Sequence, residues 1–252
     1  MKAYIINLFS AVERKKHMEK IISMNNIIEP CFIEAVDGRT LTEEERKKLV
    51  DYDMTLKTSG YTLLDGEVGV TLSHYKIYKQ IIDSLEDYAI IFEDDIVDLS
   101  GINKDLLDML KPYYETNIPT VILLSGNYRY YSLKRVNNTY KIAIVFDAWL
   151  ASGYIINKKA AEIITNEKPF WRADDWWYLK SKGVRIFGIK PHVVDQFSRE
   201  VMPSYVRFDG KIPNKSRIRE MSLLRIVNYY FCAIMRKVFR IIGFYEPEYR
   251  KK

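Results

Sequence analysis

Short apolar segments rich in β-branched residues alternate with segments of helical periodicity along the first half of the chain. Uninterrupted apolar runs are typical of strands that are covered on both faces, and such strands are predicted at residues 3–8, 30–38, 89–95 and 120–127. Helices are predicted between them, at residues 11–26, 42–50, 65–88 and 104–114. This alternation predicts an α/β fold with a mostly parallel central sheet.

The second half of the chain has a different pattern. Residues 131–157 have β character, with Asn137 and Asn138 as a hairpin turn, and two short helices and a strand are expected at 158–167, 173–183 and 184–196. Gly210, Pro213 and Asn214 cluster where the charge balance shifts. We therefore predict a domain over residues 1–210 and a helical tail over residues 211–252.

The positive charge of the chain is concentrated in this tail. The formal net charge is +6, but residues 211–252 alone carry +8, so the body is slightly acidic and does not resemble a uniformly basic nucleic-acid-binding protein. Cys31 and Cys232 belong to no Cys-x-x-Cys pair, and no cleavage site follows the first apolar stretch. These features predict free thiols and a cytoplasmic protein that does not bind nucleic acid.

Three consecutive acids, Glu93, Asp94 and Asp95, follow the apolar run of residues 88–92. Ligands of open α/β sheets bind at the carboxyl ends of the strands, and adjacent carboxylates repel one another unless a positive group balances them. Alternation along an extended segment lets Glu93 and Asp95 share a face, which suits a divalent cation such as Mg²⁺ or Mn²⁺. The alternative is that the two aspartates cap a turn.

Four segments in order resemble glycosyltransferase family 25, the lipooligosaccharide galactosyltransferase family of Gram-negative bacteria. They are YIINLFSAVERK (4–15), LDGEVGVTLSHYKIY (64–78), AIIFEDD (89–95) and ASGYIINKKAAE (151–162). The resemblance implies a nucleotide-sugar-binding fold of the GT-A type over residues 1–210 and a divalent metal, usually Mn²⁺. It also implies transfer of a sugar, with galactose as the first candidate, from a UDP-sugar donor to a glycan acceptor.

The resemblance also implies roles for individual residues. Asp95 and Glu93 correspond to the metal-binding acids, with Asp94 beside them at the donor, while Asn7 and Arg14 stand at nucleotide-contacting positions. The Gly-Glu-x-Gly-x-x-x-Ser-His segment is matched by Gly66, Glu67, Gly69, Ser73 and His74. From the residues alone, His74 could equally be a core histidine. Glu67 could instead stabilise the positive end of a helix dipole.

Asp174 and Asp175 lie among three tryptophans in the segment FWRADDWW. An inverting sugar transfer needs a carboxylate to accept the proton of the attacking hydroxyl, and either aspartate is a candidate. The alternative is a helix N-cap with tryptophans packed beneath it. His192 follows a late strand and is a candidate additional metal ligand, with Asp195 and Gln196 as alternatives.

The tail has a basic, amphipathic pattern. One side of its predicted helix carries Arg219, Ser222, Arg225, Asn228, Cys232, Arg236 and Arg240. The longest charge-free run is too short to cross a bilayer, so we expect a helix in the membrane interface with its arginines at anionic lipid heads. The alternative is packing on the enzyme body or on a second subunit, as in a homodimer.

The leading hypothesis is therefore a metal-dependent glycosyltransferase that extends a lipooligosaccharide or lipopolysaccharide acceptor, with inversion, at the cytoplasmic face of the inner membrane. A metal-dependent nucleotidyltransferase would use similar carboxylates, but the chain lacks a glycine-rich phosphate loop followed by Lys-Ser/Thr. A membrane-surface carbohydrate-binding protein without catalysis would use the tryptophans and the tail alone. Release of UDP from UDP-sugars, with and without Mn²⁺, separates these hypotheses.

Overall fold

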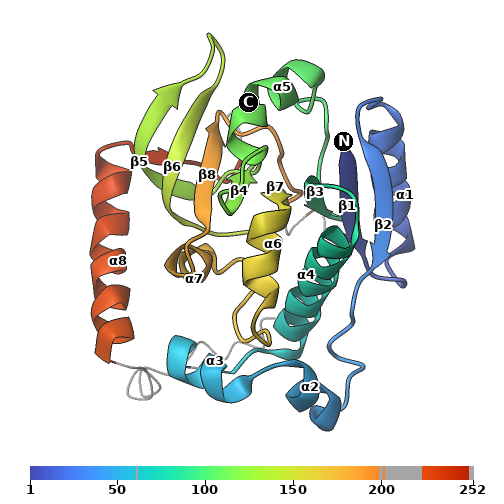
Figure 1. Ribbon diagram of the computed structural model, residues 1–252, viewed down its shortest axis with the longest axis vertical. Coiled ribbons are helices and arrows are strands. Elements are labelled where there is room, and N and C mark those ends of the chain that lie inside the picture. Colours follow the sequence, from blue (N-terminus) through green and yellow to red (C-terminus); the bar gives the residue numbers. More distant parts are fainter. Residues whose placement is uncertain (61, 199–200, 202–222, 250–252) are drawn as a thin grey trace.

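The computed structural model describes residues 1–60, 62–198, 201 and 223–249, which are organised around a single nine-stranded sheet (Figure 1). The strands lie in the order β2-β1-β3-β7-β4-β8-β6-β5-β9. Their bounds are β1 Lys2–Asn7, β2 Glu29–Glu34, β3 Tyr88–Glu93, β4 Thr120–Leu123, β5 Tyr128–Arg135, β6 Lys141–Ala148, β7 Gly153–Asn157, β8 Arg185–Lys190 and β9 Tyr245–Glu246.

Most of the central strands run in one direction. β1 pairs in parallel with β2 and with β3, and β4 pairs in parallel with β8, while β7 runs antiparallel between β3 and β4. The remaining strands, β6, β5 and β9, extend the sheet through antiparallel pairs. The predicted α/β class with a mostly parallel central sheet is confirmed, and the β5–β6 hairpin turns at the predicted asparagines.

Helices cover both faces of this sheet (Figure 1). They are α1 Val12–Ser23, α2 Glu43–Leu49, α3 Tyr52–Ser59, α4 Asp65–Asp83, α5 Lys104–Tyr114, α6 Lys158–Thr165, α7 Trp176–Ser181 and α8 Leu223–Ile241. Side chains of α1 and α5 pack with Ile90 and Phe92 of β3 on one face. Side chains of α4, α6 and α7 pack with Ala89 and Ile91 on the other. Both faces of β3 are therefore buried, which explains its unbroken apolar run.

Two helical regions differ from the prediction. Helix α4 ends at Asp83 rather than continuing to residue 88, because Ser84 adopts an extended conformation and its hydroxyl caps the carbonyl of Ile81. Helix α3 was not predicted. It begins at Asp51, whose side chain accepts a hydrogen bond from the Met54 amide, and its apolar pattern is too short to identify from periodicity.

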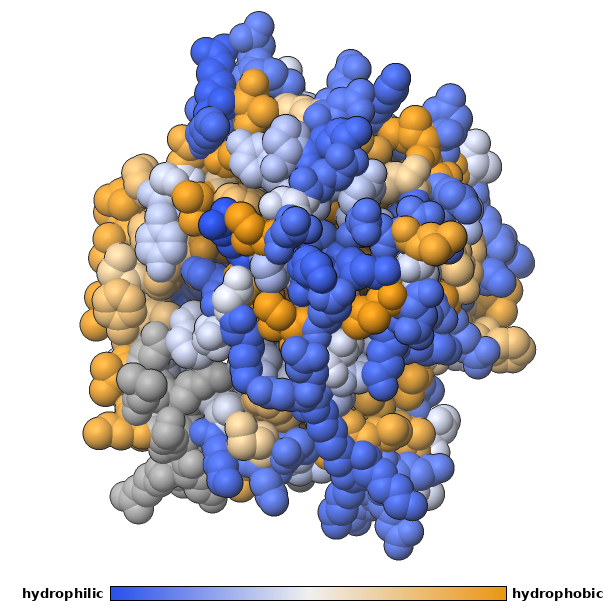
Figure 2. Space-filling model, viewed as in Figure 1, coloured by the Kyte–Doolittle hydropathy of each residue, from blue (hydrophilic) through white to orange (hydrophobic). Residues whose placement is uncertain are grey.

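The described part of the tail packs against the sheet. Helix α8 buries Cys232 and Phe239 against Phe146 of β6, and Arg236 pairs with Asp147 at 2.6 Å. The prediction that the arginines of this helix meet lipid heads is therefore wrong for Arg236, which faces the protein together with Cys232. The outward side of α8 is apolar, and Figure 2 shows hydrophobic residues along this helix at the left edge.

The rest of the tail prediction is only partly covered by the structure. Strand β9 adds to the sheet beside β5, which ties the end of the chain to the domain. The predicted boundary near residue 210, together with Arg219 and Ser222, lies outside the described residues. No helix among the described residues is long and apolar enough to cross a membrane.

Candidate active site

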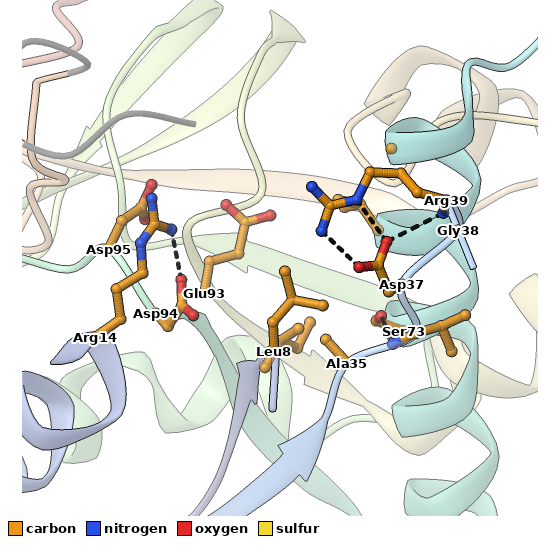
Figure 3. Close-up of a pocket in the computed structure, with 14 residues that line it drawn as sticks. Leu8, Arg14, Ala35, Asp37, Gly38, Arg39, Ser73, Glu93, Asp94 and Asp95 are labelled. Atoms are coloured by element: carbon orange, nitrogen blue, oxygen red, sulfur yellow. Dashed lines mark hydrogen bonds and ion pairs between the residues drawn. The ribbon is translucent and has the colours of Figure 1, made fainter. Parts of the chain in front are cut away.

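A cavity of about 130 Å³ opens where β1, β2 and β3 end side by side. Its walls come from the acids after β3, from Leu8 and Arg14 after β1, from residues 35–39 after β2, and from the first turns of α4 (Figure 3). This volume is smaller than the roughly 300–1,000 Å³ of common ligand pockets. A nucleotide-sized ligand would therefore extend out of the cavity.

Close backbone packing shapes one wall of this cavity. A Cβ atom on Gly38 would lie 1.9 Å from the Asp65 carbonyl oxygen, and one on Gly69 would lie 2.5 Å from the Val36 carbonyl oxygen. The Ser73 hydroxyl accepts a hydrogen bond from the Val36 amide at 2.9 Å. Gly38, together with Gly69 and Ser73 of the Gly-Glu-x-Gly-x-x-x-Ser-His segment, thus lets the loop after β2 pack closely against α4.

Asp94 is held by two partners on the neighbouring strand and helix. Its carboxylate accepts hydrogen bonds from the Asn7 amide group at 2.7 Å and from the Arg14 guanidinium at 2.8 Å. Burial raises the pKa of Asp94, although both partners act in the opposite direction. Asn7 and Arg14, predicted as nucleotide contacts, therefore brace Asp94, and of the two only Arg14 lines the cavity.

Asp95 has no such support. Its Oδ1 is buried without a hydrogen-bond partner among the described residues. Burial and the negative charges of Glu93 and Asp94 raise the pKa of Asp95 to about 7. A carboxylate in these surroundings is costly when ionised, so the site favours either a proton or a cation at Asp95.

Glu93 lines the cavity and is supported from beneath by His74. The His74 ring is buried, with Nδ1 2.7 Å from the Tyr154 hydroxyl and Nε2 3.4 Å from Glu93 Oε1. The Tyr154 hydroxyl lies 2.7 Å from that of Tyr78. His74 is thus a buried core residue behind the cavity wall, as the alternative interpretation of the sequence predicted, and it also contacts Glu93.

Glu67 caps the start of α4, accepting a hydrogen bond from the Leu64 amide at 2.9 Å. Burial raises the pKa of Glu67, and the charges of Arg172 and Asp174 also act on it, so these three side chains lie in one region. Asp174 is about a quarter exposed and accepts a hydrogen bond from the Leu150 amide at 3.4 Å. Asp174 also lies 3.8 Å from the Arg172 guanidinium and is partly accessible to solvent, although it does not line the cavity.

Asp175 has a structural position instead. Its carboxylate accepts a hydrogen bond from the Tyr178 amide at 2.9 Å and caps α7. Trp171 and Trp176 are 4% and 0% exposed, so neither can stack on a sugar. The alternative prediction, a helix N-cap with tryptophans packed beneath it, therefore holds for Asp175, Trp171 and Trp176.

His192 is enclosed by two carboxylates rather than turned toward a metal. Its Nδ1 lies 2.7 Å from Glu246 of β9, and its Nε2 lies 2.9 Å from Asp195. Because both ring nitrogens are occupied, the structure does not support His192 as a metal ligand. Asp195 and Gln196, the predicted alternatives, are also bonded, to His192 and to Ser152 at 2.5 Å.

The acids that remain fit a divalent cation. Among the described residues, no group of three or more His, Cys, Asp or Glu side chains is arranged to hold a metal. However, Mg²⁺ and Mn²⁺ are commonly held by one or two carboxylates together with waters and substrate phosphates. Glu93 and the partnerless oxygen of Asp95 supply such a donor set.

The sequence interpretation missed one part of the cavity. Asp37 and Arg39 form a two-bond ion pair on the wall opposite the acids, with an Nε–Oδ1 distance of 2.7 Å (Figure 3). The signal was present, because both residues lie at the carboxyl end of the strand predicted at residues 30–38, at the same sheet edge as the acids. Asp37 has a lowered pKa, mainly because of the hydrogen bond from Arg39.

Comparisons with known proteins identify the family of this chain. The model of glycosyltransferase family 25 (LPS biosynthesis protein) matches residues 1–175, which include every element around the cavity. Procollagen galactosyltransferase 2 of Homo sapiens is 25% identical over 173 residues, covering 66% of this chain and 28% of that protein. A putative glycosyltransferase of Haemophilus influenzae is 27% identical over 207 residues, covering 77% of this chain and 69% of that protein.

A third relative has a name that bears on activity. Inactive glycosyltransferase 25 family member 3 of Mus musculus is 34% identical over 99 residues, covering 38% of this chain and 16% of that protein. The chain thus spans less than a third of these two mammalian relatives and about two thirds of the bacterial one. Because the family model covers well over half of the chain, this protein belongs to glycosyltransferase family 25.

Proposed function

We propose that this protein is an active, metal-dependent glycosyltransferase with a GT-A type fold. It would transfer galactose from a UDP-sugar to a lipooligosaccharide or lipopolysaccharide acceptor with inversion at the anomeric carbon. Galactose is the first choice because one relative is named a procollagen galactosyltransferase. The bacterial glycan acceptor follows the family description, which refers to lipopolysaccharide biosynthesis.

One observation carries the proposal. The buried, partnerless oxygen of Asp95 lies beside two further acids in a cavity at the carboxyl ends of three adjacent strands. A protein that used this cavity only for packing would have no reason to keep a buried carboxylate oxygen without a hydrogen-bond partner there. A divalent cation bound by Asp95 and Glu93 would supply charge neutralisation for a departing diphosphate.

The protein residues would then have separate tasks. Arg14 and Asn7 fix the Asp94 carboxylate, which holds the segment after β3 against β1 and α1. His74 holds Glu93 in place from the core. Asp174 is the candidate base, because Asp175 is committed to capping α7. The acceptor oxygen would attack the anomeric carbon, its proton would pass to Asp174, and the bond to the diphosphate would break.

Donor hydrolysis tests this function directly. The purified protein is incubated with UDP-galactose, UDP-glucose and UDP-N-acetylglucosamine, and release of UDP is measured with Mn²⁺ and with a chelator. We expect Mn²⁺-dependent release, greatest with UDP-galactose and increased by a truncated lipooligosaccharide acceptor. Absence of both UDP release and metal-dependent UDP binding would refute the proposal and favour a carbohydrate-binding role.

The same experiment separates the remaining enzyme class. A nucleotidyltransferase would form a nucleotide sugar from a sugar phosphate and a nucleoside triphosphate, with release of pyrophosphate rather than UDP. We also propose, from the implied acceptor, that the protein acts at the cytoplasmic face of the inner membrane. Fractionation of cells that express the chain would test that location.

A further inference from the structure

The outward face of α8 is a continuous apolar stripe. Its members recur at steps of three and four, and each is exposed: Leu223 78%, Val227 59%, Tyr230 55%, Ile234 62%, Val238 39% and Ile241 84%. The stripe runs along a helix of 19 residues, about 28 Å long. Figure 2 shows it as a hydrophobic edge of the molecule. Contiguous apolar surfaces of this kind mark interaction sites.

The opposite side of α8 is already engaged with the domain. Cys232 and Phe239 are buried against Phe146, and Arg236 bonds Asp147 and lies over the Trp149 ring, 4.8 Å from its centre. These contacts orient the helix, so the apolar stripe cannot turn inward without breaking the partly buried ion pair of Arg236 with Asp147. The helix therefore cannot rotate to bury the stripe, and the stripe stays exposed on the surface of the domain.

The charges on α8 indicate what kind of partner it meets. The helix contains Arg225, Arg236, Lys237 and Arg240 and no acid, and the next acid after Glu220 is Glu246. Lys237 and Arg240 are exposed, and Lys237 lies next to Ile234 and Ile241 on the helix surface. A second copy docking through the same stripe would bring two cationic helices together. An anionic lipid surface would instead attract them.

We propose that α8 lies in the interface of an anionic membrane, with this apolar stripe inserted among the acyl chains and Lys237 and Arg240 at the lipid phosphates. This keeps the interfacial helix expected from the sequence, with Arg240 at the lipid heads, but Arg236 pairs with Asp147 of the domain instead. Long cationic side chains beside an apolar face reach headgroups while the face is buried. The membrane contact does not depend on the proposed function, but the use of a lipid-linked acceptor does.

Vesicle flotation tests the contact without donor, metal or acceptor. The full chain is mixed with phosphatidylcholine vesicles that contain about a quarter phosphatidylglycerol, and with pure phosphatidylcholine vesicles. We expect flotation with the anionic vesicles. The Ile234→Ser/Ile241→Ser variant should bind at least about tenfold more weakly, because two large apolar side chains no longer enter the acyl region.

Two further variants separate insertion of α8 from non-specific hydrophobic adsorption of the protein to vesicles. Lys237→Gln/Arg240→Gln should lose several-fold in affinity for anionic vesicles and little for neutral ones. The matched control, Met24→Ser/Leu85→Ser, removes apolar side chains that are 72% and 101% exposed outside α8, and it should float like the wild type. Circular dichroism confirms that each variant is folded.

Three results would overturn the proposal. They are an absence of wild-type flotation, equal flotation of the wild type and the Ile234→Ser/Ile241→Ser variant, and equal binding to anionic and neutral vesicles. Light scattering on the same samples identifies the main rival. If the wild type is a dimer that does not float and the Ile234→Ser/Ile241→Ser variant is a monomer, the stripe joins two copies of this chain and the lipid assignment is wrong.

Discussion

Replacing Asp95 by asparagine should stabilise the metal-free protein at high pH while abolishing metal-dependent turnover. The pKa of Asp95 is raised from 3.8 to about 7 by burial and by the charges of Glu93 and Asp94. The folded protein therefore binds this proton more tightly than the unfolded chain does. The stability associated with the proton is fully present below about pH 4 and is lost as the pH rises through about 7.

The magnitude follows from the difference between the two pKa values. At about pH 8 the ionised Asp95 costs the metal-free protein at most about 4 kcal/mol relative to a neutral side chain of the same shape. At about pH 4 the cost is below about 1 kcal/mol. Asp95→Asn removes the charge and keeps the shape, so its free energy of unfolding should exceed that of the wild type by these amounts.

Urea unfolding at the two pH values, in the presence of a chelator, measures this difference. Added Mn²⁺ should raise the unfolding free energy of the wild type at high pH much more than that of Asp95→Asn, because the variant keeps only Glu93 of the two carboxylates proposed to bind the metal. Asp87→Asn is the matched control, since it removes an exposed acid from the turn before β3. Equal stability of wild type and Asp95→Asn at both pH values would refute the argument from burial and charge.

Four further substitutions test other residues of the protein. In Gly38→Ala the new methyl group would clash with backbone atoms of α4. Urea melts should show a free energy of unfolding lower by about 1–3 kcal/mol, and kinetics should show a higher KM for the donor. Asp174→Asn should lower kcat by roughly 10²–10⁴-fold without loss of stability. Asp175→Ala should instead lower the stability by about 1 kcal/mol and change the activity little, because Asp175 caps α7. If Asp175→Ala lost activity and Asp174→Asn lost only stability, Asp175 would be the base. Glu246→Gln should cost about 3 kcal/mol at neutral pH. Burial alone would raise the pKa of Glu246, but the hydrogen bonds from His192 and Lys190 lower the pKa below its ordinary value of 4.5. The ionised Glu246 therefore stabilises the folded protein above about pH 4.5, and this stabilisation is lost at lower pH. In urea melts, the difference between the wild type and Glu246→Gln should accordingly shrink as the pH is lowered.

The sequence was sufficient to locate the acidic site because local patterns determine it. An apolar run without polar interruption predicts a strand buried on both faces, and Glu93, Asp94 and Asp95 follow it directly. The carboxyl end of such a strand is where an open α/β sheet binds ligands. The same reasoning could have found Asp37, which follows the neighbouring strand β2.

Long-range partners could not be predicted in this way. The enclosure of His192 depends on Glu246, 54 residues further along the chain, which reaches it only because β9 pairs with β5. Helical periodicity likewise grouped Cys232 with Arg236 on one side of the tail, but it could not tell which side faces inward. That choice depends on Asp147, a buried acid 89 residues away that accepts a bond from Arg236.

The three acids of the site differ in how far neighbouring side chains neutralise or hydrogen-bond their carboxylates. Arg14 balances the charge of Asp94 and Asn7 donates a hydrogen bond to it, and His74 supports Glu93, whereas Asp95 has no partner for its buried Oδ1. The ion pair across the cavity, Asp37 with Arg39, adds no net charge. A diphosphate entering this cavity would therefore meet uncompensated negative charge. The proposed divalent cation would offset both the burial of Asp95 and the repulsion of the donor, so metal binding and donor binding should be mutually dependent in this protein.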